Sequence, residues 1–197
     1  MAWENKGFRV VEEGFCTEIN RRTVPQIEKE NNMEYWDLYD AERKPLGRTH
    51  ARGEKFREGE YYVCCEIWVR NKEGSFLTTK RHPDKTAGNK WEFVGGGTLA
   101  GETTLDSAVR ELFEETGIVI DKSELRLFTT DAKKNYFLDI YLVKKDVDIK
   151  DVILQPEETT DAKWSSDEDI KDMVASGEFA YSVGVRYGKY RELCWEV

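Results

Sequence analysis

Apolar and polar residues alternate with the two-residue period of β-strands in the part of the chain that precedes its middle. The run YWDLYD at residues 35–40 and the run YYVCCEIWVR at residues 61–70 both follow this period. In the second run four apolar side chains share one face: Val63, Cys65, Ile67 and Val69. The NKEG sequence that follows predicts a hairpin turn into another strand, SFLTTKR, at residues 75–81.

Shorter strands and a loop are predicted on either side of a central helix. Residues 82–90 are rich in turn-forming types and predict a loop, after which WEF at residues 91–93 forms a short strand. Later, LRLFTT at residues 125–130 and NYFLDIYLV at residues 135–143 predict an antiparallel pair. DAKWSS at residues 161–166 is then the last predicted core strand.

A helix from about residue 104 to residue 116 is predicted by signals at both of its ends. Thr103 or Thr104 serves as the N-cap, and Gly117 stands where a helix needs a left-handed terminating residue. At 100° per residue one side of this helix is apolar and is expected to be buried: Leu105, Ala108, Val109, Leu112 and Phe113. A second capped helix, within SSDEDIKDMVASG, ends at Gly177.

Three glutamates lie within one arc on the other side of the first helix: Glu111, Glu114 and Glu115. Like charges a few ångströms apart disfavour joint ionisation, so a positive group is expected among them. Carboxylate oxygens at this density favour Mg²⁺ or Mn²⁺ over zinc, and protein-bound Mg²⁺ usually shares its remaining sites with water and substrate phosphate. A solvated charged helix face is the alternative interpretation.

The neighbours of these glutamates favour the metal interpretation. The run Gly95–Gly97 lets backbone groups approach a metal ion or a phosphate closely, which a free-standing surface helix does not require. Arg110 is adjacent to Glu111 and is expected to orient its carboxylate. The pattern therefore indicates phosphate chemistry.

The stretch GGTLAGETTLDSAVRELFEETGI at residues 96–118 resembles the Nudix box, Gly-x5-Glu-x7-Arg-Glu-U-x-Glu-Glu-x-Gly-U with U aliphatic, at every fixed position. This resemblance implies an α/β fold of the Nudix type, an α/β/α sandwich with a mixed central sheet and a loop-helix-loop. It also implies a hydrolase acting on phosphorus-containing acid anhydrides. Such an enzyme uses Mg²⁺ or Mn²⁺ to cleave a pyrophosphate bond in a small molecule linked to a nucleoside diphosphate.

The resemblance also implies roles for individual residues. Glu111, Glu114 and Glu115 would hold the divalent ions and water, and the Gly95 carbonyl would be a further metal ligand. Glu111 or a glutamate elsewhere would be the general base, and Glu114 and Arg110 complete the expected catalytic set.

The sequence on either side of the box holds more candidates. QPEETTDAKWSSDEDI at residues 155–170 resembles the strand and helix that close a Nudix domain, where Glu158 or its neighbour Glu157 would complete the metal site. A solvated loop acid fits these two positions at least as well. Arg81 and Lys85 have the Arg-x3-Lys spacing that grips the substrate diphosphate in isopentenyl diphosphate isomerases, although two solvent-facing cations are equally consistent with it.

The flanks of the box, from about residue 34 to residue 174, resemble the branch of the family closest to those isomerases. The isomerases protonate an alkene with a cysteine at the position where this chain reads EFVGGGT, residues 92–98, which contain neither Cys nor His. Hydrolysis is therefore the favoured activity. An isomerase-like enzyme and a non-catalytic module that binds a diphosphate are the alternatives.

Charge and composition narrow the expected partners. The 197 residues carry a formal net charge of −9, which argues against a nucleic-acid polymer or an anionic membrane surface as partner. The four cysteines fit no zinc spacing and are expected to be reduced. No apolar run has the length of a signal peptide or a membrane span, so a soluble cytoplasmic protein is expected.

One folded domain with two extensions is the expected organisation. Residues 1–33 form an N-terminal appendage, residues 34–177 the Nudix hydrolase domain, and residues 178–197 a C-terminal extension that packs on the domain or on a partner subunit. Homodimerisation is plausible from these extra segments.

Overall fold

A seven-stranded mixed sheet is the centre of the computed structural model, which describes residues 33–194. The predicted appendage at residues 1–33 lies outside the described residues except for Met33. Its strands follow the order β5-β4-β3-β8-β7, with β6 paired to β3 and β9 to β4. The bounds of the strands are β3 (Tyr62–Arg70), β4 (Phe76–Arg81), β5 (Trp91–Glu92), β6 (Val94–Gly97), β7 (Arg126–Ala132), β8 (Tyr136–Lys144) and β9 (Thr159–Ser165). A separate two-stranded sheet joins β1 (Tyr35–Tyr39) to β2 (Pro45–Ala51).

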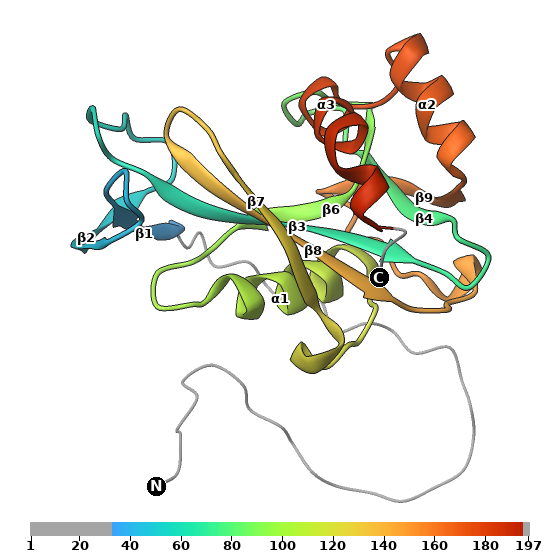
Figure 1. Cartoon of the computed structure of the whole chain (residues 1–197), viewed down its shortest axis with the longest axis horizontal. Coiled ribbons are helices and arrows are strands. Elements are labelled where there is room, and N and C mark those ends of the chain that lie inside the picture. Colours follow the sequence, from blue (N-terminus) through green and yellow to red (C-terminus); the bar gives the residue numbers. More distant parts are fainter. Residues whose placement is uncertain (1–32, 195–197) are drawn as a thin grey trace, which may run out of the picture. The chain divides into compact units, whose positions relative to one another are not determined.

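Helices cover both faces of the large sheet, with α1 on one face and α2 and α3 on the other (Figure 1). The bounds of the helices are α1 (Thr104–Thr116), α2 (Asp167–Ser176) and α3 (Tyr181–Tyr190), with short 3₁₀ turns η1 (Lys122–Glu124), η2 (Ile149–Asp151) and η3 (Arg191–Cys194). The central pair β3 and β8 is parallel, whereas β4 and β6 run antiparallel to β3. The fold is therefore the expected α/β/α sandwich with a mixed central sheet.

The alternation along β3 explains how one strand serves two hydrophobic cores. Cys65, Ile67 and Val69 face α1 and pack with its Ala108 and Leu112. Trp68 points the other way, into a second core with residues of α2 and α3: Ile170, Met173, Val183 and Tyr187. The predicted face is thus confirmed against α1 for Cys65, Ile67 and Val69, and Val63 of the same prediction is also buried.

Both predicted helix caps are present in the structure. The Thr103 hydroxyl accepts the backbone N–H of Asp106, and Gly117, with φ of 70°, donates its N–H to the Phe113 carbonyl at 2.8 Å. Ser166 caps α2 in the same way, and Gly177 ends it with φ of 74°. The predicted helix at residues 104–116 is confirmed at both ends.

Of the residues expected on the buried side of α1, Ala108 and Leu112 are buried, Leu105 and Val109 are half-buried, and Phe113 is exposed. Phe113 is 54% exposed, whereas Glu115, expected on the polar side, is only 8% exposed. At 100° per residue Glu115 stands about 60° from the fully buried Leu112, and Phe113 about 100° from it on the other side. The prediction for Phe113 was wrong because the helix is rotated so that a carboxylate, not the phenyl ring, lies against the sheet.

The C-terminal segment forms a third helix that pattern reasoning left unassigned. On α3 the Tyr187 side chain is almost fully buried in the core with Trp68, and Tyr190 is also buried. Arg186 of α3 forms a buried ion pair with Glu66 of β3. The described part of residues 178–197 therefore packs on the sheet, and the predicted boundary at residue 177 stays a prediction.

An ion pair fastens the β1–β2 hairpin to the large sheet. Arg43, in the turn of the hairpin, donates two hydrogen bonds to the buried Asp139 of β8, at 2.8 and 2.6 Å. Thr130 and Thr104 donate to the same carboxylate at 2.7 Å. Burial alone would raise the pKa of Asp139, but these hydrogen bonds and the charge of Arg43 lower it.

Replacing Arg43 by methionine is expected to destabilise the protein by about 3 kcal/mol at pH 7, because Asp139 then stays buried without its cation. Urea unfolding measures the change. Because the pKa of Asp139 is lowered in the folded protein, its charge contributes stability that is lost as the pH falls below the ordinary value of 3.8. The difference in free energy of unfolding between the variant and the wild type should therefore become smaller below that pH. Lys44→Met, at the exposed neighbouring position, is the control, and an equal loss in both variants would argue against the role of the ion pair.

In the part of the chain that the structure describes, no helix has the length and apolar character needed to cross a membrane.

Candidate active site

The guanidinium of Arg110 is the centre of a polar network on α1. Its Nε and Nη2 donate to Glu102 at 2.9 and 3.0 Å. Its Nη1 donates to Glu111 at 2.8 Å and to the more exposed Glu114 at 3.2 Å. Nη2 also donates to the Gly97 carbonyl at 3.1 Å. One cation thus pairs with two carboxylates of this helix, Glu111 and Glu114, and ties them to Glu102 and to the end of β6.

Glu102 fixes the position of Arg110 from the loop that precedes α1. Its carboxylate also accepts the Ser107 hydroxyl at 2.8 Å and the Leu99 N–H at 3.1 Å. Burial raises the pKa of Glu102, but the hydrogen bonds from Arg110 and Ser107 outweigh it, so the pKa is lowered and the carboxylate is charged at neutral pH. Glu102 therefore holds the guanidinium in place.

Glu111 lies between α1 and the glycine strand β6. A Cβ atom on Gly96 would stand 2.2 Å from Glu111 Oε1, so a larger residue at position 96 would displace the carboxylate. Gly95, the residue expected to offer its carbonyl to a metal ion, precedes it and lies against β3. A Cβ there would stand 2.4 Å from the Cys65 carbonyl. The glycine run is thus required by close approach on both sides of β6.

Burial, more than any neighbour, sets the protonation of Glu111. Burial, together with the charges of Glu114 and Glu34, raises its pKa to about 7 against the opposing effect of Arg110. Glu34 lies just before the β1–β2 hairpin, so the start of the hairpin is close enough to act on this carboxylate.

A second group of acids surrounds Glu115 at the C-terminal end of α1. Burial raises the pKa of Glu115 well above its ordinary value, and the charges of Glu111, Glu92 and Glu158 raise it further. Burial likewise raises the pKa of Glu92 to about 7. The fold therefore gathers four acidic side chains from α1, β5 and the loop before β9.

The two predicted diphosphate ligands are held by these acids. Arg81 Nη1 lies 2.5 Å from Glu92 Oε1, and its Nε donates to the Thr86 carbonyl at 2.7 Å. Lys85 Nζ lies 2.5 Å from Glu158 Oε1. Arg81 and Lys85 are both part-buried and are held by carboxylates at the rim of the acidic group. They are therefore not two free solvent-facing cations, which was the alternative interpretation of their spacing.

The donors fit a divalent metal ion by their chemistry and charge. Within residues 33–194, no three His, Cys, Asp or Glu side chains form a group that could hold a metal ion as it stands. Arg110, Arg81 and Lys85 instead pair with Glu111, Glu92 and Glu158. Even so, the pKa values of Glu111 and Glu115 are raised despite these cations. Burial and the neighbouring acids thus disfavour the charged form of these carboxylates, and a cation would stabilise it; their hard oxygen donors suit Mg²⁺ or Mn²⁺.

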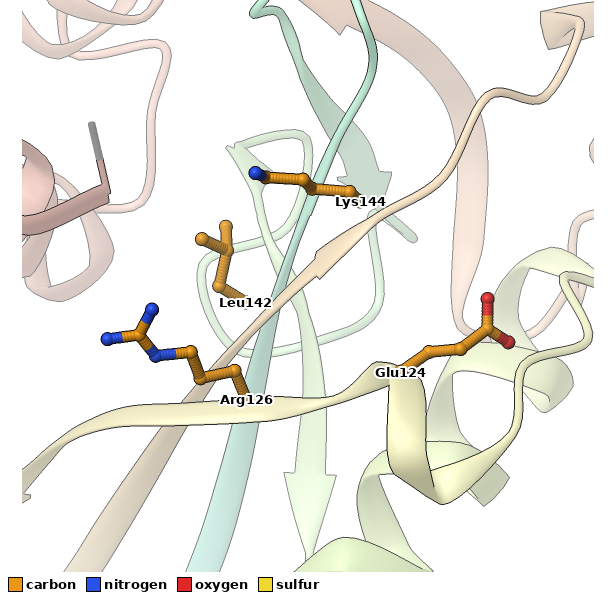
Figure 2. A pocket seen from close by; sticks show the side chains of 4 residues that line it. All are labelled: Glu124, Arg126, Leu142 and Lys144. Carbon is orange, nitrogen blue, oxygen red and sulfur yellow. The ribbon is translucent and has the colours of Figure 1, made fainter. Parts of the chain in front are cut away.

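Figure 2 shows a pocket elsewhere on the sheet, where η1 and β7 meet β8. Glu124, Arg126, Leu142 and Lys144 line it, and none of the predicted site residues does. Its lining lacks the clustered acids and glycines of the α1 site. The pocket is therefore distinct from the candidate site on α1.

The match of the chain to known proteins agrees with this geometry. The model of the NUDIX domain matches residues 63–181, from the second residue of β3 to the start of α3. This chain belongs to the Nudix hydrolase family. An uncharacterized Nudix hydrolase of Listeria monocytogenes is 38% identical over 149 residues, a match that covers 75% of this chain and 88% of the relative.

Solved structures share the fold. A crystal structure of a Deinococcus radiodurans protein superposes with a TM-score of 0.63 at 22% identity, over 75% of this chain and 92% of that chain. A bifunctional NMN adenylyltransferase/ADP ribose pyrophosphatase of Francisella tularensis, in complex with AMP and a manganese ion, gives a TM-score of 0.55 at 18% identity. That match covers 68% of this chain and 42% of that chain. At these identities the likeness concerns the fold alone.

Two acids of the site were missed or given no role by sequence reasoning. Glu102 occupies a fixed position of the Nudix box, so its spacing in the sequence could have marked it as a residue of the site. Glu92 lies in a two-residue strand beside the glycine run, where a single acid between aromatic residues shows no spacing pattern. Only the pairing of β5 with the end of β4 brings Glu92 to Arg81.

Proposed function

We propose that this chain is a Mg²⁺- or Mn²⁺-dependent hydrolase that cleaves a pyrophosphate bond in a small molecule linked to a nucleoside diphosphate. The observation that carries the proposal is the gathering of Glu111, Glu115, Glu92 and Glu158 around the C-terminal half of α1, with the cations Arg81 and Lys85 at its rim. Acids that hold a metal ion and cations that hold phosphate are the two halves of a phosphoanhydride site.

The residues of the chain divide the work of this reaction. Glu111, Glu114, Glu115 and Glu158, with the Gly95 carbonyl, would hold the ions, which supply Lewis acidity and a more acidic bound water. A glutamate of this set, Glu111 or another, accepts the proton of the attacking water.

Other residues position the reacting groups. Arg110 keeps Glu111 directed toward β6, and Glu102 keeps Arg110 in place. Arg81 and Lys85 exchange their carboxylate partners for oxygens of the diphosphate, to which a guanidinium donates in pairs. Each cation then neutralises charge on the substrate.

An assay that detects the two products of pyrophosphate-bond cleavage, such as a nucleoside monophosphate and a sugar phosphate, over a broad panel tests this proposal. The panel holds nucleotide sugars, dinucleoside polyphosphates, NAD-type compounds and isoprenoid diphosphates, each with metal-free protein and with added Mg²⁺ or Mn²⁺. The proposal predicts release from at least one compound only when the metal is present. Metal binding without release from any compound would favour the non-catalytic module. Deuterium incorporation into isopentenyl diphosphate in D₂O would favour the isomerase.

Replacing Arg81 by lysine is expected to raise KM for the hydrolysed compound on the order of tenfold to 100-fold, with a smaller change in kcat. A lysine keeps the charge but loses the paired hydrogen bonds, which are worth roughly 1.5–3 kcal/mol each when charged. Steady-state kinetics measure both constants. Arg126→Lys, in the pocket of Figure 2, is the matched control. An unchanged KM in the Arg81 variant would remove Arg81 from the substrate site.

A further inference from the structure

The pocket of Figure 2 has a volume of about 320 Å³ and lies at β7, the last strand in the order of the large sheet. Arg126 of β7 is the Cα partner of Leu142 of β8, so their side chains share one face of the sheet. Lys144 lies two residues beyond Leu142 and projects from the same face. The pocket thus places two cations at the edge of the second hydrophobic core, to which Leu142 belongs.

The two cations of this pocket have no counter-charge in the part of the chain that the structure describes. Arg126 and Lys144 are both exposed, and neither side chain forms an ion pair or a hydrogen bond with another residue of that part. The three cations of the acidic site, by contrast, are each held by a carboxylate. In a chain with a formal net charge of −9, two unpaired cations in one pocket form a local positive site.

Glu124, the acid in the lining of the pocket, is engaged on its other side. Its carboxylate accepts the Asp121 backbone N–H at 2.8 Å and the Lys145 ammonium at 3.1 Å. Figure 2 shows this carboxylate pointing away from the head groups of Arg126 and Lys144. The charge of Glu124 is therefore already paired with Lys145 and does not cancel the charges of the two cations.

A phosphate monoester matches this arrangement in charge and in size. It carries about two negative charges at neutral pH, which balance Arg126 and Lys144, whereas a carboxylate carries one. A guanidinium donates to phosphate oxygens in pairs, and an ammonium adds a point charge. The volume of the pocket lies at the lower end of the range of roughly 300–1,000 Å³ that is usual for small-molecule sites.

We propose that this pocket is a second ligand site, which binds the phosphate group of a phosphorylated small molecule between Arg126 and Lys144. The pocket shares no residue with the acidic group around α1, so this binding requires neither the divalent ion nor the hydrolytic reaction. The second site is thus independent of the proposed function.

Calorimetric titration of the metal-free protein with inorganic phosphate and with ribose 5-phosphate tests the proposal, and ribose is the matching ligand without phosphate. Both phosphates are expected to bind the wild type, whereas ribose is not. Arg126→Met and Lys144→Met should each weaken the binding of both phosphates on the order of tenfold, because each removes a charged hydrogen-bond donor. Since both residues are exposed, the variants are expected to fold.

Two control variants locate the binding. Arg81→Met removes a cation that Glu92 holds at the acidic site, and it should leave phosphate binding by the metal-free protein unchanged. Lys150→Met removes a cation that is 75% exposed and paired with Asp148, and it should also leave the binding unchanged. Equal weakening by Lys150→Met and by the pocket variants would reduce the effect to net charge and overturn the proposal.

Three further results would overturn the proposal. They are no binding of either phosphate by the wild type, binding that survives both Arg126→Met and Lys144→Met, and a loss confined to Arg81→Met, which would place the phosphate at the acidic site. Failure of the hydrolysis panel would count against the proposed function and not against this second site.

Discussion

Replacing Glu111 by glutamine is expected to reduce turnover by roughly 10²- to 10⁴-fold while the fold is retained. The amide keeps the size of the side chain beside Gly96 and can still accept from Arg110, but it neither accepts a proton nor offers a charged oxygen to a metal ion. Since burial raises the pKa of Glu111 to about 7, the neutral amide costs no stability relative to a carboxylate that is partly protonated at neutral pH.

Steady-state kinetics on the hydrolysed compound, with circular dichroism to check the fold, measure this change. Glu168→Gln, at an exposed position in the first turn of α2, is the matched control and should retain full activity. Near-normal rates for the Glu111 variant would contradict the assignment of this helix as the catalytic element.

Replacing Arg110 by methionine is expected to lower the free energy of unfolding of the metal-free protein by about 3 kcal/mol, because Glu102, Glu111 and Glu114 lose their shared cation. For a chain of this size that corresponds to a fall in melting temperature of about 10 °C. Saturating Mg²⁺ should restore more stability to this variant than to the wild type, because a cation bound to the native state replaces the missing charge.

Thermal unfolding with and without Mg²⁺ measures both effects. Arg57→Met is the control, since Arg57 is 82% exposed and its ion pair with Glu60 is a loose 3.8 Å contact that contributes little. Equal stabilisation of wild type and Arg110→Met by Mg²⁺ would indicate that the ion does not bind among these carboxylates.

Local signals were sufficient for most of the core strands, for helices α1 and α2 and for the contacts of Arg110 on α1, but not for α3. The helix at residues 104–116 followed from its caps, and the face of β3 followed from alternation, because both depend on residues close in sequence. The adjacency of Arg110 and Glu111 likewise follows from the chain itself. The pattern nonetheless misplaced Phe113, because the apolar arc of a helix is wide and only packing against the sheet fixes its rotation.

The rest of the site depends on strand pairing that no local pattern encodes. Glu92 meets Arg81 because β5 pairs with the end of β4, and Glu158 meets Lys85 because β9 lies along the same strand. The stacking of Trp36 on β1 with Tyr62 on β3 likewise depends on how the hairpin meets the sheet. Contacts between residues this far apart in sequence arise from the topology of the sheet. A single sequence, read without an alignment of its relatives, does not reveal them.

The central claim, that the acids around α1 hold the divalent ion of a hydrolase, is tested most directly by Mn²⁺ binding followed through the electron paramagnetic resonance signal of the free ion. This titration needs no knowledge of the substrate. The account predicts that the wild-type protein removes Mn²⁺ from solution, whereas Glu111→Gln and Glu115→Gln bind it at least tenfold more weakly and Glu168→Gln binds it normally. Equal Mn²⁺ binding by the wild type and both site variants would contradict the account.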